Sequence, residues 1–233
     1  MLRNIAYRFP LALSLYHFLL SWLGAAFYRF PSRELFVIGV TGTKGKTTVL
    51  ELMDAILSAD GNKTALLSSI KVKVGDHTDK NPSENTMPGR FTIQRFLRRA
   101  VKARCRYTLI EVTSQGVTQS RHRFINWNVA FLINLHPEHI EAHGSFEKYR
   151  DAKLSFLRYA AKGKAKIFLN RDDKNAGYLE GALKGANIAL YSKADSFASR
   201  VGSPGTPMGH AVMTVIGNEQ FFLSEFNKEN IAA

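Results

Sequence analysis

The chain has 233 residues, of which 45% are hydrophobic and 11% aromatic, and this composition excludes a disordered or low-complexity protein. At about 150 residues per domain, the length allows one large domain or one domain with part of a second. A single cysteine, Cys105, excludes an internal disulfide and favours a reducing compartment, so we expect a cytoplasmic protein. The net charge of +13 fits nucleic acid, small phosphorylated ligands or an anionic membrane as a partner.

The first residues of the chain differ from the rest. Leu11–Phe30 is almost wholly apolar and is flanked by arginines. About 20 apolar residues are enough to span a bilayer, but serines, a histidine and interface-preferring aromatic rings occur throughout, and no small-residue cleavage site follows. We therefore expect an N-terminal helical segment, 1–31, that packs on the domain or lies in a membrane interface. A spanning helix and a cleaved signal are the alternatives.

From residue 32 to 233 we expect one domain in which strands and helices alternate. Short apolar runs predict buried strands at Leu35–Val40, Thr64–Ser68, Tyr107–Glu111, Val129–Asn134, Lys166–Asn170 and Ile188–Tyr191, with a two-faced strand at Lys71–Val74. Helices are predicted after the first strand and at Phe91–Ala103, Phe146–Tyr159 and Asn175–Leu183, a loop at Asn81–Gly89, and a hairpin at Ala211–Ser224. This alternation predicts an α/β fold: a P-loop-type, mainly parallel sheet with helices on both faces and a C-terminal β-hairpin.

The most specific motif lies between the first strand and its helix, at Gly42–Thr48 (GTKGKTT). Glycines let backbone amides approach phosphate oxygens, and the helix N-terminus adds partial positive charge. Lys46 can reach the terminal phosphates, and Thr47 can hold Mg²⁺. The strict pattern has glycine where Val40 stands, so this is a variant loop. It predicts a nucleotide site.

Further polar groups follow other buried strands. Glu111 ends a strand, where ligands bind in open parallel sheets, and can hold a metal ion near the phosphates, although a lone glutamate there is more often a surface charge. Asn134–Gly144 contains three histidines and two glutamates, but their spacing does not match a structural zinc site, so Mg²⁺ fits better. Lys153 lies within a predicted helix, where a lysine is ordinarily solvated.

These elements, in this order and spacing, resemble the central ATP-binding domain of the Mur ligases, most of all those that add a diamino acid to UDP-N-acetylmuramoyl-L-alanyl-D-glutamate. Folylpolyglutamate synthase is a more distant relative with the same loop. The resemblance runs from about Phe36 to the last residue. It rests on Thr41–Thr48 (family TGTNGKTT), Thr86–Pro88 (Thr-Thr-Pro), Glu111–Gly116 (EVSSHG), Asn134–Gly144 and Asn170–Asp173. The departures from the family pattern are Lys44 for Asn, Met87 for Thr, Gln115 for His, and Glu138 and Glu141 for Asp.

The resemblance implies a role for individual residues. The ATP-binding residues would be Gly42, Thr43, Lys44, Gly45, Lys46, Thr47, Thr48 and Asn170. The metal would be held by Thr47, Glu111, His139 and Lys153, and the catalytic residues would be Lys46, Lys153 and His139. Lys153 matches the family lysine that reacts with CO₂ to form a carbamate, whose oxygens can ligate Mg²⁺ where an ammonium cannot. The UDP-N-acetylmuramoyl-peptide would contact Thr86, Ser114, Gln119 and Arg121.

The function implied by the resemblance is ATP-driven amide-bond formation in peptidoglycan synthesis, with ATP and Mg²⁺ as cofactors. We expect the apolar segment to stand in place of the family's N-terminal domain. Its C-terminal domain, which binds the incoming amino acid, would begin after Leu223–Ala233, so we expect a fragment or a separate chain that completes it. A non-catalytic nucleotide-binding adaptor, a folylpolyglutamate-synthase-like ligase and a small-metabolite kinase are the alternatives.

The positive charge is densest between Arg90 and Arg106, in and after a predicted helix. No aromatic stacking platform accompanies it, so we do not expect a nucleic-acid partner. Most of these side chains would be a solvated helix face. The others would steer anionic substrates or hold the protein at a membrane, which would add membrane association to the cytoplasmic location.

Overall fold

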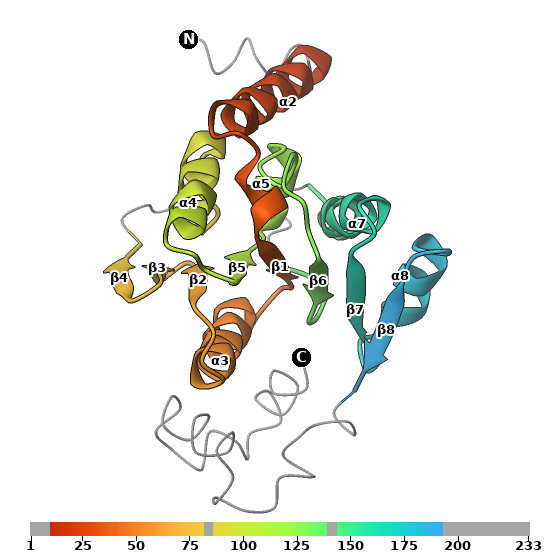
Figure 1. The fold of residues 1–233 in the computed structure, drawn as a ribbon. Helices are drawn as coiled ribbons and strands as arrows, with labels where there is room; N and C mark the ends of the chain where they lie inside the picture. Colours follow the sequence, from red (N-terminus) through yellow and green to blue (C-terminus); the bar gives the residue numbers. More distant parts are fainter. Residues whose placement is uncertain (1–9, 82–85, 139–143, 193–233) are drawn as a thin grey trace, which may run out of the picture.

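The computed structural model describes residues 10–81, 86–138 and 144–192 (Figure 1). Its centre is an 8-stranded sheet with the order β4-β3-β2-β5-β1-β6-β7-β8. The strands are β1 (Phe36–Thr41), β2 (Thr64–Leu67), β3 (Lys71–Val74), β4 (His77–Lys80), β5 (Tyr107–Glu111), β6 (Val129–Leu132), β7 (Lys166–Asn170) and β8 (Ile188–Tyr191). Every pairing is parallel except β2–β3 and β3–β4, so the predicted mainly parallel α/β fold is confirmed.

Helices cover both faces of this sheet. They are α2 (Pro10–Phe27), α3 (Lys46–Ala59), α4 (Arg90–Lys102), α5 (Ser114–Thr118), α7 (Phe146–Lys162) and α8 (Ala176–Ala182), with a 3₁₀ turn η1 (Pro31–Glu34). One apolar cluster joins the sheet to α4, α5, α7 and α8, and a second joins its other face to α3. Figure 1 shows α3 on the opposite side of the sheet from α4, α5 and α7. Such two-sided cover explains why the central strands are nearly continuous apolar runs.

Two elements of the structure have no counterpart among the predicted ones. Strand β4 consists of four exposed residues, so it lacks the apolar alternation that marks a strand, and it forms only by pairing with β3. Helix α5 has five residues and begins where the Thr113 side chain accepts the Gly116 amide. The predicted hairpin at 211–224 lies outside the described residues.

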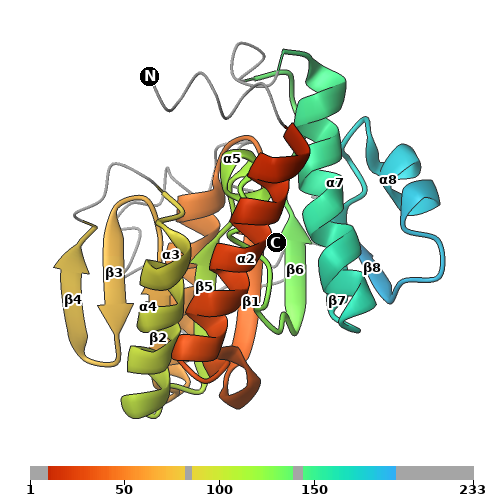
Figure 2. The same ribbon diagram turned by 90° about the horizontal axis from the view of Figure 1, so that it is seen from above.

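Helix α2 forms an outer layer over α4 (Figure 2). The Ser21 hydroxyl donates to the Ser120 carbonyl at 2.8 Å, and the Arg98 guanidinium donates to the Tyr28 carbonyl that follows the helix. At Gly24 the backbone of Arg90 comes within 3.6 Å of the position of a Cβ, so a small residue permits the close approach. Packing of this segment on the domain, one of the two expected arrangements, is thus observed. Across the ranges 10–81, 86–138 and 144–192, we find no helix with the length and apolarity needed to cross a bilayer.

Candidate nucleotide and metal site

The predicted phosphate loop connects the carboxyl end of β1 to the first turn of α3. Gly45 takes a φ of 81° just before the helix, a left-handed conformation that favours glycine. A Cβ on Gly42 would lie 2.3 Å from Cγ1 of Ile133, so the loop can approach β6 only because this residue has no side chain. The glycines therefore serve the shape of the loop as well as access to a ligand.

Asn134, two residues after the end of β6, braces this loop from the side. Its Oδ1 accepts the Thr43 amide at 2.9 Å and the Lys44 amide at 3.0 Å, while its Nδ2 donates to the Lys44 carbonyl at 3.0 Å. Asn134 is buried, and three hydrogen bonds from one rigid side chain fix the path of the loop.

The hydroxyl of Thr43 joins the loop to two other parts of the domain. It accepts the His136 amide at 2.9 Å and the Tyr149 hydroxyl, on α7, at 3.1 Å. Burial raises the pKa of Tyr149, which keeps that hydroxyl a donor. The exposed Lys44 side chain forms an ion pair with Glu138 at 2.9 Å. The loop is thus held by groups from both β6 and α7.

Oxygen atoms gather beside the start of α3. The Thr47 hydroxyl donates to Oε2 of Glu111 at 3.0 Å and lies 2.8 Å from the Ser69 hydroxyl. The Ser69 amide donates to the same carboxylate oxygen at 2.9 Å, and Glu111 is only 3% exposed. The predicted pair of metal ligands, Thr47 and Glu111, therefore lies together at the carboxyl ends of β1 and β5.

Two lysines share the carbonyl of Gly42 behind the loop. Nζ of Lys46 donates to it at 3.1 Å and to the Thr43 carbonyl at 3.0 Å, and Nζ of Lys153 donates to it at 2.7 Å. Burial lowers the pKa of Lys46, while Glu111 and Glu138 oppose that shift. Burial, and then the charge of Lys46, lowers the pKa of Lys153 well below its ordinary value. Lys153 is 2% exposed, so the ordinary expectation that a lysine within a helix is solvated is wrong for this residue.

The remaining residues predicted to bind ATP or metal have different placements. Asn170 is buried at the end of β7, where its amide donates to the Ile133 carbonyl and its Oδ1 accepts the Asp172 amide, so its observed contacts are structural. Thr48 is half-buried in the first turn of α3. His139 lies outside the described residues. Among the residues that are described, no group of three His, Cys, Asp or Glu side chains could hold a metal.

The residues predicted to bind the second substrate lie around α5. Ser114 is buried at its start, three residues after Glu111. Arg121 donates to the Gln119 side chain at 2.6 and 3.1 Å and to the carbonyl of Met87, next to the half-buried Thr86. Burial and the neighbouring Arg90 lower the pKa of Arg121. The structure thus brings the predicted substrate loop together with Gln119 and Arg121.

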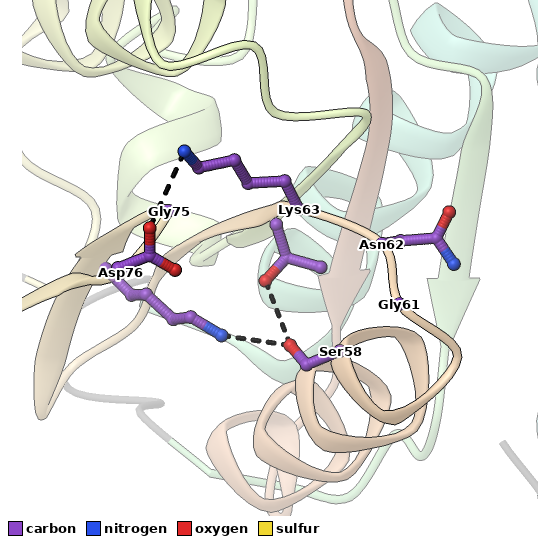
Figure 3. Close-up of a pocket in the computed structure, with 8 residues that line it drawn as sticks. Ser58, Gly61, Asn62, Lys63, Gly75 and Asp76 are labelled. Atoms are coloured by element: carbon purple, nitrogen blue, oxygen red, sulfur yellow. Dashed lines mark hydrogen bonds and ion pairs between the residues drawn. The ribbon is translucent and has the colours of Figure 1, made fainter.

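A polar hollow lies at the other end of the sheet, where β2 begins (Figure 3). It is lined by residues that include Ser58, Lys63, Thr64, Lys73 and Asp76. Lys63 pairs with Asp76 at 3.6 Å, and Lys73 pairs with the buried Asp54 at 2.9 Å. Since a carboxylate balances each lysine, this hollow is a poorer phosphate site than the glycine loop.

A family model described as the Mur ligase middle domain matches residues 40–221, which is most of the chain. The chain belongs to the Mur ligase family.

Curated relatives agree with this assignment. A UDP-N-acetylmuramoyl-L-alanyl-D-glutamate–2,6-diaminopimelate ligase of Geobacillus kaustophilus is 33% identical over 91% of this chain and 45% of its own length. A UDP-N-acetylmuramyl-tripeptide synthetase of Treponema pallidum is 37% identical over 60% of this chain and 26% of its own length. The chain thus spans less than half the length of these relatives.

Solved structures share the Mur ligase fold described above. The structure of a UDP-N-acetylmuramoyl-L-alanyl-D-glutamate–2,6-diaminopimelate ligase superposes with a TM-score of 0.60 at 23% identity, over 72% of this chain and 35% of that one. FolC of E. coli in complex with ADP superposes with a TM-score of 0.55 at 18% identity, over 95% of this chain and 62% of that one. At these identities the likeness concerns the fold.

Sequence reasoning missed several polar contacts of this Mur ligase domain. Asn134 was part of a recognised motif but was given no role, although a polar residue shortly after a strand that pairs with β1 must lie beside the loop. Tyr149 and Ser69 gave no local signal. They reach the loop only through the packing of α7 and the position of β2.

Proposed function

We propose that this chain is the ATP-binding core of a cytoplasmic amide ligase that extends a UDP-N-acetylmuramoyl-peptide by one amino acid. One observation carries the proposal: the Thr47–Glu111 oxygen pair and the buried amine of Lys153 lie on either side of a braced phosphate loop. The substrate class rests on the printed names of the relatives from Geobacillus kaustophilus and Treponema pallidum.

The donor atoms of the site suit Mg-ATP. Hydroxyl and carboxylate oxygens from Thr47 and Glu111 are the hard ligands that Mg²⁺ prefers, and we assign them to the metal together with Lys153 and His139. Bound Mg²⁺ would neutralise charge on the phosphate oxygens. Backbone amides of Gly42–Gly45 and the start of α3 would bind those oxygens, and Lys46 would leave the Gly42 and Thr43 carbonyls to join them. In the same fold, the folylpolyglutamate synthase of Yersinia pestis is described in complex with AMPPNP and a Mn ion.

Lys153 is suited to carry a carbamate. Formation of a carbamate needs a neutral amine, and burial beside Lys46 lowers the pKa of Lys153 in that direction. The nitrogen lone pair would form a bond to the carbon of CO₂, the amine would release one proton to solvent, and the product would carry one negative charge. That charge would lie close to Lys46 and would be attracted to its ammonium group.

We propose the following reaction for the complete ligase. A carboxylate oxygen of the peptide attacks the γ-phosphorus, the bond from that phosphorus to the leaving ADP oxygen breaks, and an acyl phosphate forms. Lys46 offsets the negative charge that develops on the transferred group. The amine of the incoming amino acid then displaces phosphate and loses a proton. Thr86, Ser114, Gln119 and Arg121 would orient the peptide, with Arg121 facing its anionic groups.

The complete ligase needs a part that binds the incoming amino acid. Since the chain covers 45% of the Geobacillus kaustophilus relative, we propose that this part is supplied by a continuation of the chain or by a separate polypeptide. We place the domain itself at 32–233 and the apolar segment at 1–31.

Calorimetry tests the nucleotide site. The purified chain should bind Mg-ATP at millimolar nucleotide, Lys46→Ala should abolish that binding, and the matched variant Lys102→Ala, an exposed lysine of α4, should leave it unchanged. Failure of the unaltered chain to bind Mg-ATP would contradict the proposal.

A reconstitution assay tests the ligase reaction. The chain would be mixed with the C-terminal domain of a relative, and ADP release would be measured with UDP-N-acetylmuramoyl-peptide and with a folate acceptor. Release that depends on the peptide and the amino acid supports the proposal. Release with the folate acceptor alone favours a FolC-like ligase, whose fold covers 95% of this chain. ATP binding without release in either mixture favours an adaptor.

A further inference from the structure

Helix α2 has two unlike faces, and the one that packs on the domain is built mainly of small or polar residues, together with the half-buried Leu13 and Leu20. Ser21 is 2% exposed and Ala25 0%, and Gly24 is buried against the backbone of α4. His17, on the same side, contacts the guanidinium of Arg90. A helix of a globular protein ordinarily turns its bulky apolar residues inward, whereas most of those in α2 are exposed.

The outward side carries the bulky residues. We define the α2 apolar face as Leu11, Leu15, Phe18, Leu19, Trp22 and Leu23, which are between 38% and 86% exposed. Counted from Leu11, they fall at positions i+4, i+7, i+8, i+11 and i+12, the spacing of one helix face. An apolar surface concentrated in this way on one element indicates an interaction site rather than scattered surface residues.

The sequence on both sides of α2 is basic. Residues 1–33 contain four arginines and no aspartate or glutamate. At the far end of the helix, the ring of Phe27 lies 6.3 Å from that of the exposed Phe91, and Phe91, Arg95 and Arg99 form one exposed stripe of α4. Glu34, the first acidic residue of the chain, is paired with Arg98 at 2.9 Å.

We propose that the α2 apolar face binds the surface of an anionic lipid bilayer, with α2 parallel to the membrane plane. Apolar side chains would enter the acyl boundary while arginines of residues 1–33 and of the exposed stripe of α4 meet lipid phosphates. The parallel orientation follows because the inner face contacts the domain from His17 to Ala25, so only one side of the helix is open. A second copy of the chain is a poor occupant, since it would bring two surfaces of the same positive charge together.

Tryptophan fluorescence offers a direct test on the full chain, because it contains only two tryptophans. Trp22 is 46% exposed on the α2 apolar face, while Trp127 is 2% exposed in the core. On vesicles of mixed phosphatidylcholine and phosphatidylglycerol, the emission should shift to the blue and be quenched by nitroxide-labelled lipid. Pure phosphatidylcholine should give a weaker shift, and added salt should reduce the shift on the mixed vesicles.

Substitutions locate the contact. The triple variant Leu15→Gln, Leu19→Gln, Leu23→Gln should partition onto the mixed vesicles about tenfold less or weaker still. Ile70→Gln, at a residue 59% exposed elsewhere on the surface, is the matched control and should partition normally. Mg-ATP binding by the triple variant should equal that of the unaltered chain, which separates this result from misfolding and from failure of the proposed ligase site.

Each of the following results would overturn the proposal. The unaltered chain shows no shift or lipid quenching; it binds neutral and anionic vesicles equally; or the triple variant binds as well as the control. A dimer in sedimentation that the triple variant abolishes would assign the α2 apolar face to a second copy instead.

Discussion

Removal of the Asn134 side chain should disrupt the phosphate loop more than its size suggests. In Asn134→Ala, the Lys44 amide and the Lys44 carbonyl both lose a partner. The Thr43 amide keeps a second acceptor, the Asn134 backbone carbonyl at 3.1 Å, so its loss is partial. Asn128→Ala is a matched control, because Asn128 makes one side-chain bond to β1, to the Val37 amide at 2.7 Å, at the opposite end of the strand.

The magnitude follows from the number of bonds. At about 1 kcal/mol per hydrogen bond, Asn134→Ala should lower the free energy of unfolding by about 2–3 kcal/mol and Asn128→Ala by about 1 kcal/mol. If the nucleotide must then order the loop, a cost of about 2 kcal/mol would raise the Kd for Mg-ATP about thirtyfold. Asn128→Ala should leave that Kd unchanged, because the hydrogen bond that it removes is made to β1 and not to the phosphate loop.

Urea unfolding and Mg-ATP calorimetry on both variants measure the two effects. The decisive comparison is affinity at equal foldedness, so binding is measured where each variant is fully native. If Asn134→Ala is destabilised as described but binds Mg-ATP like the unaltered chain, the brace does not organise the site and the reasoning is refuted.

Three further predictions concern single side chains. Burial lowers the pKa of His122 from 6.5 to about 3, so the folded chain resists protonation of this side chain. Between pH 6.5 and pH 5 the unaltered chain should therefore lose about 2 kcal/mol of unfolding free energy relative to His122→Phe. Equal acid sensitivity of the two proteins in urea unfolding would count against this. Gly42→Ala sets a Cβ 2.3 Å from Ile133 and should weaken Mg-ATP binding at least about tenfold in calorimetry. The control variant Gly181→Ala, on α8, should bind normally, because its Cβ would meet no atom within 4 Å. Similar affinities of the two variants would be inconsistent with the close approach of the loop to Ile133. The pKa of Lys153 is lowered in the folded state, so its amine binds a proton more readily after unfolding. Without Mg²⁺ and CO₂, the unfolding free energy of the unaltered chain should therefore rise relative to that of Lys153→Met between pH 7 and pH 9, by up to about 1.4 kcal/mol per pH unit. Parallel plots of unfolding free energy against pH for the two proteins would disprove a neutral amine.

Local sequence was sufficient for most of the strands and for the centre of the site. Strands β5, β7 and β8 have the predicted bounds, because each is a short, mainly apolar run bordered by polar residues. The glycine loop between β1 and α3 was recognisable for a similar reason, since the residues that its backbone conformation requires are neighbours in the sequence. The position of Glu111 beside Thr47 followed from one rule, that parallel strands end at the same edge.

Tertiary packing decided what these residues contact. Lys153 is 111 positions from Gly42 in the sequence. Only the packing of α7 against the sheet buries its amine and brings it within hydrogen-bond distance of the Gly42 carbonyl. Helix α2 is the clearest case: its sequence favoured a helix that packs on the domain or lies in a membrane interface, and left a spanning helix and a signal as alternatives. Only its contacts with α4 and Ser120 show that Ser21, Gly24 and Ala25 point inward and that most of the large apolar residues point outward. Hydropathy sums over a segment, whereas the direction of each side chain depends on which face finds a partner.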